Sequence, residues 1–202
     1  KQVAELPEVN SSEGYVLTVT PDQVLIRATS GAGLFYGVQT MLQMADEKGL
    51  PVGIIADEPR FAYRGFMMDV SRHFFDKEFI KKQMDALAYY KLNRLHLHLT
   101  DAAGWRLEIK KYPRLTEFAA WREFPTWKEW WNNGRRYEEE GSKDAHGGYY
   151  TQDDIRELVA YAQERFITVI PEIEMPAHSE EVLTAYPELS CCLLYTSPSP
   201  RD

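Results

Sequence analysis

The chain has 202 residues, of which 44% are hydrophobic and 13% are aromatic, which is enough for a packed core in one or two domains. Its formal net charge of −8 argues against the phosphate backbone of a nucleic acid as a partner. No run approaches the roughly 18 apolar residues of a membrane-spanning helix, so we expect no membrane span. The two cysteines, Cys191 and Cys192, are adjacent and predict no disulfide framework.

Residues 1–57 are expected to form the C-terminal part of a small α+β domain, which contains both helix and sheet. Two runs rich in β-branched residues, at 15–20 and 24–29, flank a proline-containing turn and predict a hairpin. Apolar residues then recur with helical spacing over 34–45, and a glycine and a proline soon after end this helix.

Residues 58–190 alternate predicted strands with predicted helices, which indicates an α/β fold. The predicted strands cover 64–70, 94–100 and 167–174. Asp76 is a good N-cap for the first helix, and Thr151 with Asp154 resembles a capping box for the second. The predicted buried faces of the two helices are Ile80, Met84, Leu87 and Ala88, then Ile155, Leu158, Val159 and Ala162. A barrel and a doubly wound sheet both remain compatible with this order.

A long excursion over 102–150 separates the second predicted strand from the second predicted helix. A loop of this length in a compact domain is usually functional or locally ordered. Four tryptophans crowd its middle, and they form either a wall on which a sugar stacks or a small apolar cluster that pins the loop: Trp121, Trp127, Trp130 and Trp131.

Ionisable residues follow each predicted strand. The Arg72 guanidinium could grip vicinal hydroxyls or a carboxylate, or simply pair with Asp69. Asp101 could reach over the carboxyl end of its strand, or cap a turn. His178 next to an acid would make an orienting pair, because the acid holds the imidazole in one tautomer.

Two histidines, His96 and His98, alternate with leucines and so share one face of their strand. They could belong to a metal site with His178 and Asp101, as in a metal-dependent barrel hydrolase, or form a hydrogen-bonded pair in the interior. Glu172 and Glu174 alternate on the third strand, and both could point inward.

Five motifs together resemble the family 20 glycoside hydrolases, the β-N-acetylhexosaminidases. Their order and spacing match over about residues 14–190. The motifs are RGFMMDVSRHF at 64–74, KLNRLHLHLTD at 91–101, GWRLEI at 104–109, GYYT at 148–151 and VIPEIEMPAH at 169–178.

This resemblance implies the first three βα units of a TIM (β/α)8 barrel, preceded by the end of the small domain. It implies exo-acting hydrolysis of terminal non-reducing N-acetylglucosamine or N-acetylgalactosamine by retaining, substrate-assisted catalysis, without a metal or organic cofactor. Arg72 would bind the 3- and 4-hydroxyls of the sugar, and Asp101 with His178 would tune an acid/base glutamate. A periplasmic or secreted location is implied as well, while the glycan bearing the sugar stays open.

The chain departs from the family pattern at Ala102-Ala103, where the family usually has Asp-Asp or Asp-Gln, and in having no Gly-Gly-Asp-Glu sequence. The acid/base glutamate and the aspartate that orients the acetamido group are therefore expected to be absent, and we expect a truncated fragment that is inactive alone. Residues 191–202 do not resemble the family and are expected to form a disordered tail. A metal-dependent TIM-barrel hydrolase and a non-catalytic sugar-binding module are the alternatives.

Overall fold

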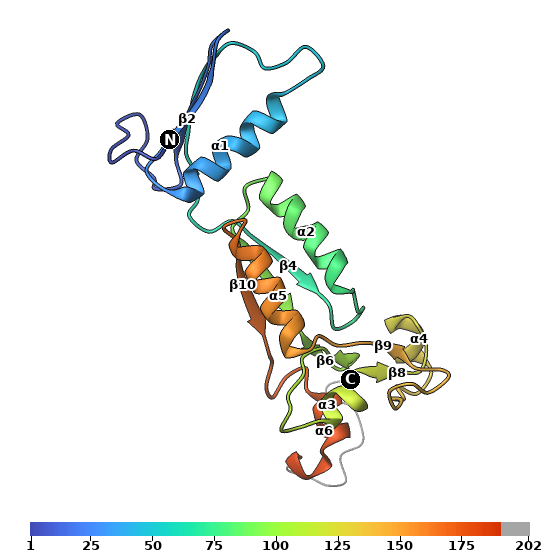
Figure 1. The fold of residues 1–202 in the computed structure, drawn as a ribbon. Helices are drawn as coiled ribbons and strands as arrows, with labels where there is room; N and C mark the ends of the chain where they lie inside the picture. Colours follow the sequence, from blue (N-terminus) through green and yellow to red (C-terminus); the bar gives the residue numbers. More distant parts are fainter. Residues whose placement is uncertain (191–202) are drawn as a thin grey trace. The chain divides into compact units, whose positions relative to one another are not determined.

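A computed structural model describes residues 1–190, and the predicted tail at 191–202 lies outside the described residues. The chain forms two compact units (Figure 1). The first unit comprises Lys1–Phe66, Lys81–Arg94 and Tyr161–Thr168, and the second comprises Met67–Ile80, Leu95–Ala160 and the described residues after Thr168. No helix among residues 1–190 is both long and apolar enough to cross a membrane.

An antiparallel sheet and one helix build the first part of the chain. Strand β1 (Tyr15–Val19) pairs with β2 (Val24–Ala28) and with β3 (Gly53–Asp57), in the order β2-β1-β3. Helix α1 (Gly31–Met44) lies along this sheet, and Figure 1 shows α1 and β2 in blue. The predicted hairpin and helix are confirmed, whereas β3 was not anticipated. The core of this part consists of Tyr15, Leu17, Val19, Ala28 and Tyr36.

A second sheet has the order β10-β5-β4, formed by β4 (Gly65–Asp69), β5 (Arg94–His98) and β10 (Thr168–Glu172). Along two neighbouring strands of this sheet, residue numbers of the hydrogen-bonded partners increase in the same direction. The Asn93 amide donates to the Arg64 carbonyl and the Val70 amide to the His98 carbonyl. The strands are therefore parallel, and their carboxyl ends meet at one edge. A parallel sheet with helices fits part of a barrel.

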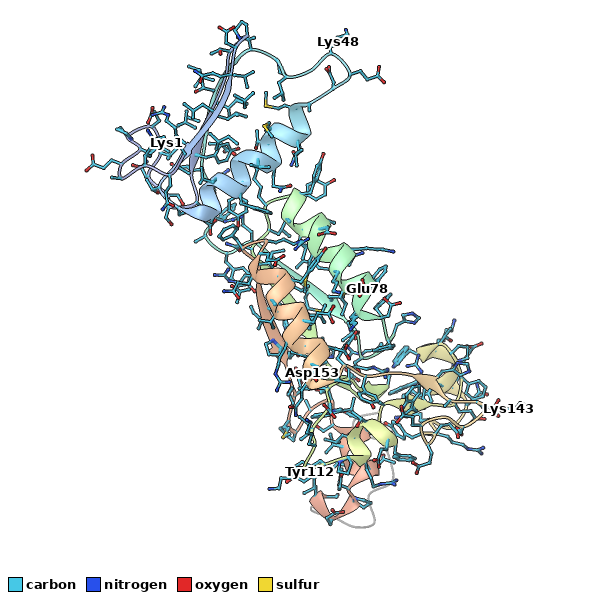
Figure 2. The ribbon with its side chains drawn as sticks, in the orientation of Figure 1. Lys1, Lys48, Glu78, Tyr112, Lys143 and Asp153 are labelled. Atoms are coloured by element: carbon cyan, nitrogen blue, oxygen red, sulfur yellow. The ribbon has the colours of Figure 1, made fainter. Side chains whose placement is uncertain are left out.

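Helices α2 (Lys77–Tyr89) and α5 (Gln152–Gln163) follow the predicted pattern. The Asp76 carboxylate accepts the Phe79 amide at 2.7 Å, which confirms the predicted N-cap. Figure 2 labels Glu78 and Asp153, which lie in the first turns of the two helices. The predicted buried face of α5 is wrong at Val159, which is 44% exposed, because that face is narrower than the sequence suggested.

The excursion contains short elements rather than an irregular loop. These are β6 (Thr100–Asp101), β7 (Gly104–Trp105), α3 (Arg114–Glu117), β8 (Trp121–Arg122), α4 (Trp127–Asn132) and β9 (His146–Gly147). Trp130 is fully buried, and its indole donates to the Arg136 carbonyl at 2.9 Å. Trp130 therefore pins the excursion, as the apolar-cluster interpretation requires.

A last pair of elements, α6 (Glu180–Ala185) and the 3-10 helix η1 (Pro187–Leu189), packs against the excursion. Val182 and Ala185 of α6 share an apolar cluster with Trp105, Leu115 and Ala119. The sequence did not predict α6, because six residues are too few to establish a helical repeat.

Candidate active site

Three predicted site residues follow the carboxyl ends of neighbouring parallel strands. Arg72 lies just after β4, Asp101 ends β6 directly beyond β5, and His178 lies beyond β10. The carboxyl ends of the strands in an open parallel sheet or barrel are where such sites form. The topology therefore brings three segments that are distant in sequence to one edge.

Asp101 is the centre of this cluster. Its Oδ2 contacts the Arg72 Nη2 closely and lies 2.6 Å from His178 Nδ1 and 3.3 Å from His98 Nε2. Its Oδ1 accepts the Ala102 amide at 2.6 Å. Asp101 is 4% exposed, so protein donors replace water around the carboxylate. The structure thus brings Arg72, Asp101 and His178 together.

Arg72 spans two carboxylates. Its Nη1 donates to Asp69 Oδ2 at 2.9 Å while its Nη2 faces Asp101. Asp69 Oδ1 also accepts the amides of Ser71 and Arg72 at 3.0 Å each, which fixes the turn after β4. Arg72 therefore pairs with Asp69, as one interpretation of the sequence predicted, and it pairs with Asp101 as well. The Arg72 side chain is 35% exposed, so donors remain available to a ligand.

His178 is held by the loop after β10. Its backbone has φ of 49°, in the left-handed region that non-glycine residues rarely adopt. The neighbouring Ser179 hydroxyl lies within hydrogen-bond distance of the Glu174 and Ala177 carbonyls, which closes the loop. His178 Nε2 is 3.9 Å from Glu174 Oε2, which is too far for a hydrogen bond. The ring therefore engages Asp101 through one nitrogen.

His96 and His98 point to the same side of β5, as their spacing predicts, and both reach Glu172. Glu172 Oε2 is 2.5 Å from His96 Nε2, and Oε1 is 2.9 Å from His98 Nδ1. Partial burial raises the pKa of Glu172, but hydrogen bonding to His98 and the other neighbours outweighs burial and lowers it overall. Within residues 1–190, no group of three or more His, Cys, Asp or Glu residues is arranged to hold a metal ion. The geometry favours the hydrogen-bonded interpretation of this histidine pair.

Arg106 supports the site, and the sequence reasoning did not single it out. It is fully buried and donates to five backbone carbonyls, those of Val70, Ser71, Ala103, Ala120 and Gly148. Burial lowers the pKa of Arg106 to about 9, so the guanidinium is still charged at neutral pH. A Cβ at Gly104 would collide with this guanidinium, which explains a glycine there. A charged side chain carries no sequence signal of such burial.

Two further buried groups complete the surroundings. Arg122 donates to the Arg72 carbonyl at 2.9 Å and to the Pro125 carbonyl at 3.0 Å, so it fixes the backbone that carries Arg72. Glu181, three residues after His178, is fully buried, and neither carboxyl oxygen has a hydrogen-bond partner among residues 1–190. Burial, with smaller effects of Asp101 and Glu180, raises the pKa of Glu181 to about 8. Glu181 is therefore a neutral acid at pH 7.

Comparison with protein families matches most of the chain. A family model described as "Glycosyl hydrolase family 20, catalytic domain" matches residues 61–201. A second, described as "Glycosyl hydrolase family 20, domain 2", matches residues 2–58.

Curated relatives are similar over nearly the whole chain. A beta-hexosaminidase of Porphyromonas gingivalis is 46% identical over 89% of this chain, and one of Akkermansia muciniphila is 42% identical over 93%. The matched regions are only 22% and 36% of the lengths of these two relatives. The chain thus spans a quarter to a third, approximately, of the proteins it resembles.

Solved structures share the fold. An exo β-N-acetylglucosaminidase from Vibrio harveyi, solved in complex with N-acetylglucosamine, aligns with a TM-score of 0.76 and 39% identity. The alignment covers 89% of this chain and 28% of that structure. The α/β architecture described above is therefore that of part of a larger fold.

Proposed function

The chain belongs to glycosyl hydrolase family 20, and on that premise we propose that it is part of an exo-acting β-N-acetylhexosaminidase. The substrate would be a glycan or glycoconjugate with a terminal non-reducing N-acetylglucosamine or N-acetylgalactosamine. The exo β-N-acetylglucosaminidase from Vibrio harveyi, solved in complex with N-acetylglucosamine, supports the first of these two sugars. The single observation that carries the proposal is the meeting of Arg72 and His178 at Asp101 Oδ2.

The proposed reaction uses the substrate's own acetamido group. Its carbonyl oxygen attacks the anomeric carbon, the glycosidic oxygen leaves with a proton from a glutamic acid, and water then opens the cyclic intermediate with retention. The required Asp-Glu pair follows a Gly-Gly in the family, and no Gly-Gly-Asp-Glu occurs in this chain. We therefore propose that the chain needs a further part of a family 20 protein for turnover.

Each site residue has a proposed role in that reaction. The partly exposed Arg72 guanidinium binds the 3- and 4-hydroxyls of the sugar, because its fixed fork matches vicinal oxygens. Asp101 holds His178 through Nδ1, which fixes the tautomer and leaves Nε2 to contact the acid/base glutamate.

A completed chain tests this function directly. By the completed chain we mean a chimera in which residues 1–190 are joined to the remaining part of the Porphyromonas gingivalis relative. It is assayed with 4-nitrophenyl N-acetyl-β-glucosaminide and, as the matched control, with 4-nitrophenyl β-glucoside. Because the glucoside lacks the acetamido nucleophile, we expect its turnover to be slower by about 100-fold or more.

Two results would contradict the proposal. One is equal turnover of the two nitrophenyl substrates by the completed chain, which would remove the acetamido group from the mechanism. The other is nitrophenol release by the original chain alone, which would show that its own residues suffice. The periplasmic or secreted location is a separate proposal, which fractionation of the native host with an antibody to this chain tests.

A further inference from the structure

His98 lies between two carboxylates inside the Asp101 cluster. Its Nε2 is 3.3 Å from Asp101 Oδ2, and its Nδ1 is 2.9 Å from Glu172 Oε1. The His98 side chain is 6% exposed, so water competes little for either ring nitrogen. An ionised carboxylate only accepts hydrogen bonds. A ring with protons on both nitrogens therefore satisfies both contacts, whereas a neutral ring satisfies one.

Glu172 is itself fixed against β5. Its second carboxyl oxygen is 2.5 Å from His96 Nε2, and its backbone carbonyl accepts the Leu99 amide at 3.3 Å. Both the side chain and the backbone of Glu172 thus contact β5 or the residue that follows it. This makes it a rigid acceptor that holds the orientation of the His98 ring.

His98 also differs from the other donors to Asp101. The side chains of Arg72 and His178 are 35% and 41% exposed, so a bound sugar could displace them or compete for them. His98 is enclosed, and the titratable groups that face it are Asp101, Glu172 and the His178 ring, whose centroid is 5.7 Å from that of the His98 ring. Among these three side chains, His98 is the least accessible to a ligand.

We propose that His98 is a positioning residue, held by Glu172 as an imidazolium, that fixes the Asp101 carboxylate while His178 presents its free Nε2 to the reaction. This inference rests on the proposed function, since it assigns His98 a part in that same site. Its chemistry is nevertheless a property of the residues in this chain. The imidazolium can therefore be tested without turnover.

The first test is spectroscopic and uses the chain as it stands. Long-range proton–nitrogen NMR of the ¹⁵N-histidine-labelled chain at pH 7 reports which ring nitrogens carry protons, with His98→Gln used to assign the signal. We expect both nitrogens of His98 to be protonated. In Glu172→Gln the amide no longer carries the charge that favours the imidazolium, so we expect one proton on the ring.

The second test is kinetic and uses the completed chain. His98→Gln should lower kcat by about 10- to 100-fold, the usual cost of losing a group that orients a site residue. KM should change by less than about threefold, because Arg72 still binds the sugar. The matched control is His146→Gln, an exposed histidine of β9, which should change kcat by less than about twofold.

The outcomes separate this inference from the proposed function. A singly protonated His98 in the parent chain, or a kcat for His98→Gln equal to that of His146→Gln, overturns the positioning role even if the completed chain is active. A doubly protonated His98 that becomes singly protonated in Glu172→Gln supports the arrangement. If the completed chain is then inactive, it is the proposed function that fails.

Discussion

The buried charge of Arg106 fixes the backbone of several segments that carry or adjoin the site residues. Its guanidinium donates to backbone carbonyls after β4, in the β6–β7 turn, after α3 and before α5. Within the described part of the chain no carboxylate pairs with it directly, so several oriented carbonyl dipoles take the place of one ion pair. The position of Arg72 depends on this arrangement, because the Ser71 carbonyl is one of the five acceptors.

We expect Arg106→Met to be strongly destabilising. The substitution keeps most of the apolar volume but removes the Arg106 donor from five carbonyls, of which that of Ala120 still accepts the Gly148 amide. The loss should be about 3–5 kcal/mol in the free energy of unfolding. Urea unfolding followed by tryptophan fluorescence measures it. Arg136→Met is the matched control, because the Arg136 side chain is 74% exposed, and it should change stability by less than about 0.5 kcal/mol. Equal effects at the two positions would show that the carbonyl cage contributes little.

Glu181 should make the stability of the chain depend on pH. Its pKa is raised from 4.5 to about 8 in the folded state, so the folded chain binds more protons than the unfolded chain between these values. The stabilising contribution of protonated Glu181 is fully present below about pH 4.5 and is lost as pH rises towards about 8. Glu181→Met removes this loss, so its advantage over the parent should grow by about 2–3 kcal/mol between pH 5 and pH 7.

Urea unfolding at the two pH values measures the Glu181 effect. Comparing the two pH values cancels any constant difference in packing between methionine and glutamate. Glu188→Met, at an exposed carboxyl of η1, is the control and should change stability by less than about 0.5 kcal/mol at either pH. An advantage of Glu181→Met that is the same at pH 5 and pH 7 would show that Glu181 ionises normally in the folded chain.

At the scale of elements, α5 owes its N-terminus to a reciprocal cap. The Thr151 hydroxyl accepts the Asp154 amide at 3.0 Å, and Asp154 Oδ2 accepts the Thr151 amide at 3.0 Å. The predicted capping box with an aspartate is thereby confirmed. Lys77 of α2 adds a contact of 2.8 Å to Asp154 Oδ1, so the cap also ties the first turns of α2 and α5 together.

Asp154→Asn should weaken this cap in a pH-dependent manner. Hydrogen bonds from Lys77, and then from Thr151, lower the pKa of Asp154 from 3.8 to about 2. Its contribution is therefore present above about pH 4 and is lost as pH falls towards 2. After an allowance for solvent screening, we expect Asp154→Asn to cost about 1 kcal/mol at pH 7 and almost nothing near pH 2.

Hydrogen exchange of the α5 amides, together with thermal unfolding at the two pH values, measures the cap. The neighbouring Asp153 carboxyl is 91% exposed and takes no part in the box, so Asp153→Asn is the matched control. It should leave amide protection in the first turn within about twofold of the parent. If Asp153→Asn and Asp154→Asn lower the protection equally, general helix-dipole effects rather than the box stabilise α5.

At the scale of the whole molecule, the second sheet has two outer strands, β4 and β10. Large apolar side chains in or just after these strands are exposed, namely Phe66, Met67, Ile173 and Met175, at 44%, 53%, 43% and 73%. Exposed apolar groups next to unpaired strand edges favour association with other chain segments. The described part of the chain thus presents surface that a longer family 20 protein would cover.

We expect the chain to bind an apolar fluorescent dye several-fold more strongly than the completed chain does, because the added segments cover this surface. Dye titration at equal protein concentration measures the difference. The Porphyromonas gingivalis relative, treated identically, gives the reference value for a covered sheet. Equal dye binding by the chain and the completed chain would mean that the exposed side chains of β4 and β10 do not form a binding surface.

The fold could be predicted where side-chain periodicity and local caps agree. The hairpin of β1 and β2, the helices α1, α2 and α5, and the three parallel strands all have such signals. Strand β3 lacks one, since its Ile54 is 73% exposed and does not mark a buried face. In the site, motif resemblance singled out Arg72, Asp101 and His178. The burial of Arg106 and Glu181 was not predictable, because tertiary packing alone puts these charged residues inside.

The anchoring of the excursion has a practical consequence. Arg106 donates to the Ala103 carbonyl near the start of the excursion and to the Gly148 carbonyl near its end, and the hydroxyl of Tyr150, its last residue, donates to the Phe75 carbonyl at 2.5 Å. The peptide bonds between Gly141 and Ala145 lie outside these attachments and beyond the hydrogen bond of 2.7 Å from the Glu140 amide to the Glu117 carbonyl. A protease cut there would leave two pieces that stay assembled through non-covalent contacts, so this stretch suits the insertion of a tag or the splitting of the polypeptide into complementing halves.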